Sequence, residues 1–176
     1  MEEKKLRSLR ATALVMGIAG SVVMLHSLLM ACFSYTDPAA GNTAISMFHY
    51  LDVKMTIAFG LLEMSIVFSL LGFAVPQIMV GSFTGLWAGF ICGDILKRSA
   101  EMKYSNVNLG FGMYMFILSG VLFVASGIFF LGTANKQKAS GSDNRKPALF
   151  RKLEVLCSII LGLSMVIFSI LEVVKH

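Results

Sequence analysis

Apolar residues fill five long stretches of the chain, and polar residues are confined to short segments between them. Each stretch has about the 20 residues that a helix needs to cross the hydrocarbon core of a bilayer. The pattern therefore predicts an all-α fold, with one transmembrane domain over residues 1–176 built as a polytopic helical bundle. The expected spans are residues 11–35, 55–75, 77–96, 108–132 and 153–174.

The stretch from residue 55 to residue 96 allows two interpretations. A single helix over this stretch would be roughly 60 Å long, which is twice the thickness of the hydrocarbon core. Pro76 lies at its middle, and proline disfavours helical structure in the residue before it. We therefore expect a hairpin that turns near residues 74–77, giving five crossings. The alternative has four crossings, with residues 55–96 crossing once and then forming a re-entrant loop.

Three polar segments connect the expected spans. Residues 36–54 begin with turn-forming residues and continue into a short amphipathic stretch, which either lies in the membrane interface or forms an ordered loop. Residues 97–107 are expected to be a polar connector. Residues 133–152 form a basic loop rich in Ser, Gly and Asn, whose composition is typical of a linker.

The positive charges indicate the orientation of the chain in the membrane. The sequence has 15 Lys and Arg against 10 Asp and Glu, a net charge of +5. These residues flank the apolar stretches and are not interleaved with aromatic residues, so nucleic acid is not an expected partner. Five crossings with a cytoplasmic N-terminus place ten basic residues inside and five outside, as the positive-inside rule requires, whereas four crossings divide them eight to seven. We expect a multi-pass protein of the plasma membrane.

Small residues at helical spacing indicate how the helices pack. Four glycines lie four residues apart between residues 81 and 93, and each costs a helix in water roughly 1 kcal/mol relative to alanine. In a bilayer, glycines allow two helix backbones to approach closely, which offsets this cost. A second seam runs along the last span in steps of four and three. The expected packing residues are Gly17, Gly81, Gly85, Gly89, Gly93, Ser158, Gly162 and Ser169.

Three acidic residues are the candidate binding groups for an ion or substrate. Glu63 lies near the middle of the second expected span, where a charged carboxylate costs roughly 2.5 to 3.5 kcal/mol. Such a carboxylate either binds a proton or cation, or stays protonated and hydrogen-bonded inside the bundle. Asp94 follows the third span's glycines, and Glu172 ends the seam of the fifth span.

The sequence contains no pattern that predicts catalysis, a metal site or a cofactor. No nucleotide-binding loop, metalloprotease helix, nucleophile elbow or zinc-ligand spacing occurs in it. His26 and His49 are the residues with which a haem or metal site would begin, but no third ligand accompanies them. Cys32 and Cys92 fall at similar depth in the five-span arrangement, so a disulfide between them stays open.

Two functions from different classes fit these features. The first is a non-enzymatic structural or accessory subunit, which binds copies of itself or a larger membrane protein through glycine-lined helix faces. The alternative is a small oligomeric transporter or channel that uses Glu63 as a proton- or cation-binding carboxylate. A redox subunit that binds a lipid or quinone through His26 is a more distant third.

Overall fold

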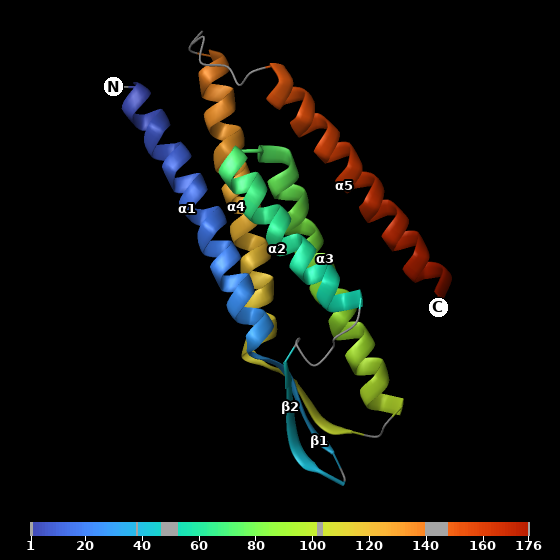
Figure 1. The fold of residues 1–176 in the computed structure, drawn as a ribbon. Helices are drawn as coiled ribbons and strands as arrows, with labels where there is room; N and C mark the ends of the chain where they lie inside the picture. The colour runs from blue at the N-terminus through green and yellow to red at the C-terminus, as the bar shows by residue number, and fades with distance from the viewer. Residues whose placement is uncertain (1, 38, 47–52, 102–103, 140–147, 176) are drawn as a thin grey trace.

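Five helices and one small sheet make up the described part of the chain (Figure 1). The computed structural model describes residues 2–37, 39–46, 53–101, 104–139 and 148–175. The predicted mostly helical bundle is confirmed. The helices are α1 (Glu2–Leu29), α2 (Val53–Leu71), α3 (Ala74–Glu101), α4 (Phe111–Ala139) and α5 (Ala148–Lys175).

The first four helices form a bundle, and α5 lies outside it along α3 (Figure 1). Within the bundle, α4 is the central element because it packs closely against both α1 and α3. Three segments of the described helices are long and apolar enough to cross a membrane, namely Lys4–Leu29, Ala74–Glu101 and Phe111–Gln137, whereas the apolar part of α2 is shorter.

The turn between α2 and α3 follows from one glycine. Gly72 has a φ of 66°, in the left-handed region that closes a helix C-terminus. The Phe73 backbone N–H donates to the Phe68 carbonyl at 2.9 Å, and the Gly72 N–H donates to the Ser69 carbonyl at 3.3 Å. The rings of Phe68 and Phe73 stack over this turn. The hairpin predicted near residues 74–77 therefore turns slightly earlier, and Pro76 lies in the first helical turn, where its missing N–H is tolerated.

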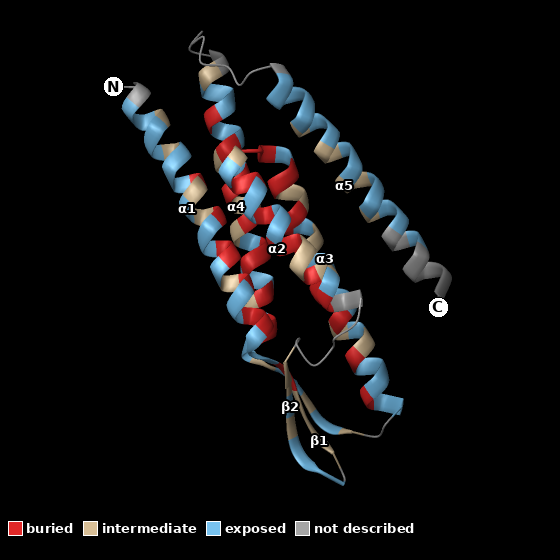
Figure 2. Cartoon of the chain, in the orientation of Figure 1, coloured by how far each residue is buried: buried red, intermediate tan, exposed pale blue. Residues whose placement is uncertain are grey.

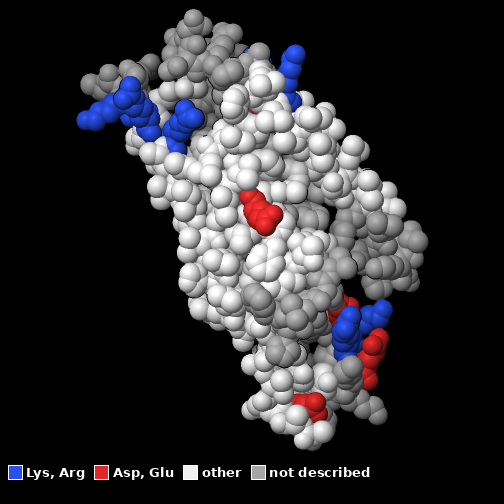
Figure 3. Space-filling view, in the orientation of Figure 1, with Lys and Arg blue, Asp and Glu red and all other residues white. Residues whose placement is uncertain are grey.

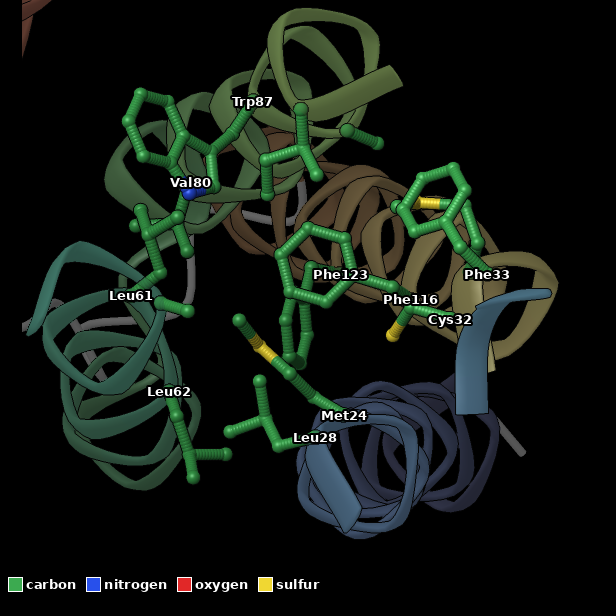
Figure 4. Packing of buried hydrophobic residues seen from close by; sticks show 14 of the residues in the cluster. Met24, Leu28, Cys32, Phe33, Leu61, Leu62, Val80, Trp87, Phe116 and Phe123 are labelled. Atoms are coloured by element: carbon green, nitrogen blue, oxygen red, sulfur yellow. The ribbon is translucent and has the colours of Figure 1, made fainter. Parts of the chain in front are cut away.

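The interior between the four bundle helices is filled by large apolar side chains. Figure 4 shows Met24 and Leu28 of α1 pointing toward Phe116 and Phe123 of α4, with residues of α2 and α3 closing the other sides. Lipid would solvate these side chains as well as the protein interior does, so their contribution is close dispersion contact rather than escape from water. Figure 2 shows this buried interior in red and the pale, exposed surface of most of α5.

A three-stranded antiparallel sheet covers one end of the bundle, which the sequence analysis did not predict. Its strands are β1 (Ala31–Asp37), β2 (Gly41–Ser46) and β3 (Ser105–Leu109), in the order β2-β1-β3. The first span was expected to reach residue 35, and the fourth to begin at residue 108. Both boundaries were wrong, because the backbone there hydrogen-bonds between strands rather than within a helix.

Contacts at the sheet join the first and second halves of the chain. The Gly110 N–H donates to the Cys32 carbonyl at 2.7 Å, which fixes the start of α4 beside β1. The rings of Tyr35 and Tyr104 stack with centroids 4.3 Å apart. Partial burial of Tyr35, followed by the neighbouring Tyr104 phenol, raises the pKa of the Tyr35 phenol above its usual value. The sheet thus connects α1, α3 and α4 at one end of the bundle.

Charged side chains gather at the two ends of the bundle. Figure 3 shows blue atoms at the end opposite the sheet, blue and red atoms at the sheet end, and between them a surface with a single red group. At the sheet end, Asp94 and Arg98 form an ion pair of 3.2 Å on α3. The basic residues described at the opposite end are Lys4, Lys5, Arg7, Arg10, Lys136, Arg151 and Lys152.

Candidate functional site

The four glycines of α3 have different surroundings. Gly81 packs against α4 so closely that a Cβ placed on it would come to 2.6 Å from the Gly120 carbonyl oxygen, and a Cβ on Gly120 would come to 2.9 Å from the Gly81 carbonyl oxygen. At Gly85, Gly89 and Gly93, a Cβ would have open space around it. Apart from the adjacent residues and the nearby backbone of α3 itself, no described atom lies within 4 Å of the Cβ position. One glycine therefore makes an internal helix contact, and the other three are open.

Helix geometry explains this difference. An α-helix turns by about 100° per residue, so a step of four residues overshoots a full turn by about 40°. Three such steps carry Gly93 about 120° around the helix from Gly81. The stripe consequently starts on the buried face against α4 and moves onto the outer surface, where Leu86 is 54% exposed and Phe90 is also exposed.

Glu63 lies on the outer surface of α2. Its side chain is exposed, as are those of its neighbours Met64 and Val67, while Ser65 and Ser69 face the interior. Gly60, one turn away, is also open, since no described atom lies within 4 Å of its Cβ position. Figure 3 shows red atoms in the middle of the otherwise uncharged surface over this helix. A carboxylate at this position would meet lipid unless another molecule covers it.

The seam of α5 faces α3. Ser158, Gly162 and Met165 are half-buried, whereas the large apolar residues on the other sides of α5 are exposed. A Cβ on Gly162 would lie 3.3 Å from the Met79 side-chain methyl. The side chains of Ser169 and Glu172, further along the same seam, lie outside the described ones.

A carboxylate of α5 caps the N-terminus of α3. The Ala74 backbone N–H donates a hydrogen bond of 2.8 Å to Glu154 Oε1. The first N–H groups of a helix have no partner within it and carry a partial positive charge, so this acceptor both satisfies a donor and complements the helix dipole. Glu154 carries no local signal for this role in the sequence, because the residue that it caps is 80 positions away.

The remaining candidate residues are dispersed. Asp94 is paired with Arg98 one helical turn away, near the sheet. His26 is exposed, and its Nδ1 is 2.8 Å from the Val22 carbonyl oxygen. His49 lies outside the described residues. Within the described residues, no three His, Cys, Asp or Glu side chains come together to hold a metal, and no disulfide joins Cys32 to Cys92.

The structure brings together a set of buried polar side chains that the sequence analysis had not assembled. The Ser21 and Ser65 hydroxyls are 3.0 Å apart, linking α1 to α2. Ser126 Oγ donates to the Ala13 carbonyl at 2.7 Å, linking α4 to α1. Ser69 and Gln77 are buried near the hairpin turn. In the sequence, Gln77 stands out only as an amide residue inside an apolar span.

Comparison with known proteins gives no assignment, because no protein-family model, curated protein or solved structure matches this chain significantly. Function must therefore be argued from the chain's own surfaces, of which two stand out. They are the open glycine stripe of Gly85, Gly89 and Gly93 on α3, and the outer face of α2 with Gly60 and Glu63.

Proposed function

We propose that this protein is a non-enzymatic, structural or accessory subunit of the plasma membrane that associates with other transmembrane helices through the open glycine stripe. The observation that carries the proposal is the empty space at Gly85, Gly89 and Gly93 on the uncharged part of α3. Three glycines in succession weaken a helix unless close backbone contact compensates. Within the described residues, the chain itself supplies that contact only to Gly81.

The proposed orientation has five crossings, with the N-terminus in the cytoplasm. The basic end formed by α1, α4 and α5 would then face the anionic inner leaflet, and the sheet would face outward. Helices α2 and α3 run in opposite directions from the Gly72 turn, which supports two crossings rather than a single long helix there. Tags at the two termini should therefore be accessible from opposite sides of sealed vesicles, and tags accessible from one side would support four crossings.

The partner that we propose for the stripe is a second copy of this chain. The rim of the stripe is apolar, since Leu86 and Phe90 flank it and are exposed, and an identical stripe offers a complementary surface without buried charge. A two-fold contact would bring the same residues of both copies together. Glu63 suggests that another protein surface also covers the outer face of α2, because a carboxylate exposed to lipid is energetically costly.

Self-association in proteoliposomes tests this function. Wild-type protein labelled with donor and acceptor dyes should show energy transfer that rises with the protein-to-lipid ratio. The Gly85→Leu/Gly89→Leu variant should reduce the apparent association constant by at least about tenfold, which corresponds to about 1.4 kcal/mol, because two leucine side chains would separate the backbones.

Gly132→Leu is the matched control for this test. Gly132 is also an exposed helical glycine with no described atom within 4 Å of its Cβ position, but it lies on α4 outside the stripe. This variant should associate as the wild type does. Equal association of all three proteins, or a wild type that stays monomeric at every lipid ratio, would contradict the proposal.

The alternative function, an oligomeric transporter or channel, depends on Glu63. Because Glu63 is on the outer surface of α2, it could line a route only between subunits and not through a single bundle. Proteoliposomes loaded with a pH-sensitive dye should then show proton flux that Glu63→Gln abolishes. Absent flux in the wild type would argue against proton transport, and unchanged flux in the variant would remove Glu63 from the transport mechanism.

A further inference from the structure

Two polar side chains inside the bundle differ from the other buried serine and threonine side chains. Gln77 is 0% exposed and Ser69 is 1% exposed. The Gln77 amide nitrogen and oxygen have no hydrogen-bond partner among the described residues. The same is true of the Ser69 hydroxyl. By contrast, the buried Thr84 hydroxyl donates to the Val80 carbonyl of its own helix at 2.8 Å. Ser69 and Gln77 therefore lack the hydrogen bonds that buried polar side chains usually make inside a membrane bundle.

Both residues lie close to the turn of the α2–α3 hairpin. Ser69 is two residues before the end of α2 and Gln77 is three residues after the start of α3, so they are about 3 Å and about 4.5 Å along their helices from the turn. The Ser69 hydroxyl reaches α1 at Gly17, where a Cβ would collide with it. The same Cβ position is 3.0 Å from Ser126 Oγ on α4. Ser69, Gln77, Gly17 and Ser126 thus form one layer, which we call the polar layer.

The chemistry of the polar layer selects a small neutral ligand. The Gln77 amide offers two donors and an acceptor, and the Ser69 hydroxyl offers one donor and an acceptor. Ser126 Oγ uses its proton on the Ala13 carbonyl, so it retains only acceptor capacity. None of the four residues of the layer is charged. Water, which needs two to four polar partners, matches these groups.

We propose that the polar layer binds water inside the bundle, held by the Gln77 amide and the Ser69 hydroxyl. The water would join the α2–α3 hairpin to the α1–α4 pair by hydrogen bonds, at a depth where lipid supplies none. Gly17 has a defined role in this arrangement, because a side chain there would displace the Ser69 hydroxyl. This internal site is independent of the association surface on α3.

Solid-state NMR of the reconstituted protein tests the proposal directly, because the sequence contains two glutamines, Gln77 and Gln137. With only glutamine side-chain nitrogens labelled, a water-edited spectrum reports which amide lies next to water. Gln137, half-buried near the basic end of α4, provides the reference signal, and Gln137→Ala assigns it. Rapid transfer from water to the fully buried Gln77 amide is expected, and a Gln77 signal that receives none would overturn the proposal.

Thermal stability provides a second test. The melting temperature should change in opposite directions depending on whether the Gln77 amide holds water or has no partner. Replacing Gln77 with methionine keeps the volume and removes the hydrogen-bonding groups. If the amide holds water, Gln77→Met should lower the melting temperature in detergent by several degrees. If the amide is merely unsatisfied, removing it should raise the melting temperature. Thr84→Val, at a buried hydroxyl that bonds its own helix, is the matched control and should cause a smaller shift.

Discussion

Gly81 and the open glycine stripe belong to the same sequence pattern but to two different regions of the molecule. Gly81 and Gly120 bring the backbones of α3 and α4 into direct contact inside the bundle. Gly85, Gly89 and Gly93 have comparable spacing and an apolar setting, yet meet no other described element. Glycines spaced four residues apart therefore need not contact the same neighbouring helix. The stripe rotates around the helix by about 40° at each step.

The seam of α5 provides the complementary case. Its steps alternate between four and three residues, an average of 3.5 that stays close to the 3.6 residues of a helical turn. The described members Ser158, Gly162 and Met165 accordingly all face α3 and are half-buried. A seam with alternating steps can thus follow one neighbour along its length, whereas a strict step of four leaves its first neighbour after about one or two turns.

The largest expected effect separates the two glycine regions. Gly81→Val should destabilise the protein by about 3 kcal/mol, because its side chain would meet the Gly120 carbonyl and the Val124 backbone rather than a flexible side chain. Gly89→Val should leave the stability of the monomer unchanged or raise it by a few tenths of a kcal/mol, since valine is the better helix former. Thermal unfolding of monomeric, detergent-solubilised protein measures both.

Equal losses in the two variants would contradict this comparison. They would mean that Gly89 also has a close neighbour within the chain. A loss at Gly89 that appears only at high protein concentration has a different meaning, because it would place that neighbour in a second copy, as the proposed function requires. The measurement should therefore be repeated over a range of protein concentrations.

A smaller effect is expected where a glycine is needed for its backbone conformation. Gly72→Ala should cost about 1 to 2 kcal/mol, because alanine is strained at a φ of 66°. Gly60→Ala, inside α2, is the matched control. It should stabilise the monomer by up to about 1 kcal/mol, since the space around it is open and alanine favours helix. Chemical unfolding in detergent measures both, and a neutral Gly72→Ala would show that the hairpin turn does not depend on that glycine.

Much of the helical arrangement could be predicted from the sequence, because long apolar stretches carry a strong local signal. The α2–α3 hairpin was also predictable, because the length of the apolar stretch required a turn and Pro76 located it to within a few residues. The sheet could not be predicted in this way. Residues 31–35 are apolar enough to continue the first span, and their strand partners lie both nearby in β2 and far away in β3. Strand pairing between distant segments leaves little trace in local hydropathy.

The candidate sites were less predictable than the fold. The sequence identified Glu63 and the glycines but could not show which face of each helix would be covered. Glu63 was expected to avoid lipid, and the structure places it on the outer surface. Gln77 and Ser126 belong to different helices, so the polar layer exists only after α3 and α4 have packed. Contacts between helices decide these features, and a single sequence does not specify them residue by residue.

The smallest expected effect concerns the hydrogen bond by which Glu154 of α5 caps the N-terminus of α3. Glu154→Ala should destabilise the protein by about 0.5 to 2 kcal/mol, because the Ala74 N–H loses its acceptor and the α3 N-terminus loses a complementary charge. Since α5 contacts the bundle mainly through α3, the variant should also loosen α5. Spin labels at Val121 on α4 and Leu163 on α5, both exposed, should report a broader distance distribution once the native cysteines are replaced by serine.

Two further variants sharpen this last comparison. Ser164→Ala removes a hydroxyl on the exposed side of α5 that bonds only the Ile160 carbonyl of its own helix, so it should leave the distance distribution unchanged. Glu154→Gln keeps an acceptor for the Ala74 N–H but removes the charge, and should lie between the wild type and Glu154→Ala. If Glu154→Ala leaves both stability and the distance distribution intact, the half-buried seam alone holds α5 on α3.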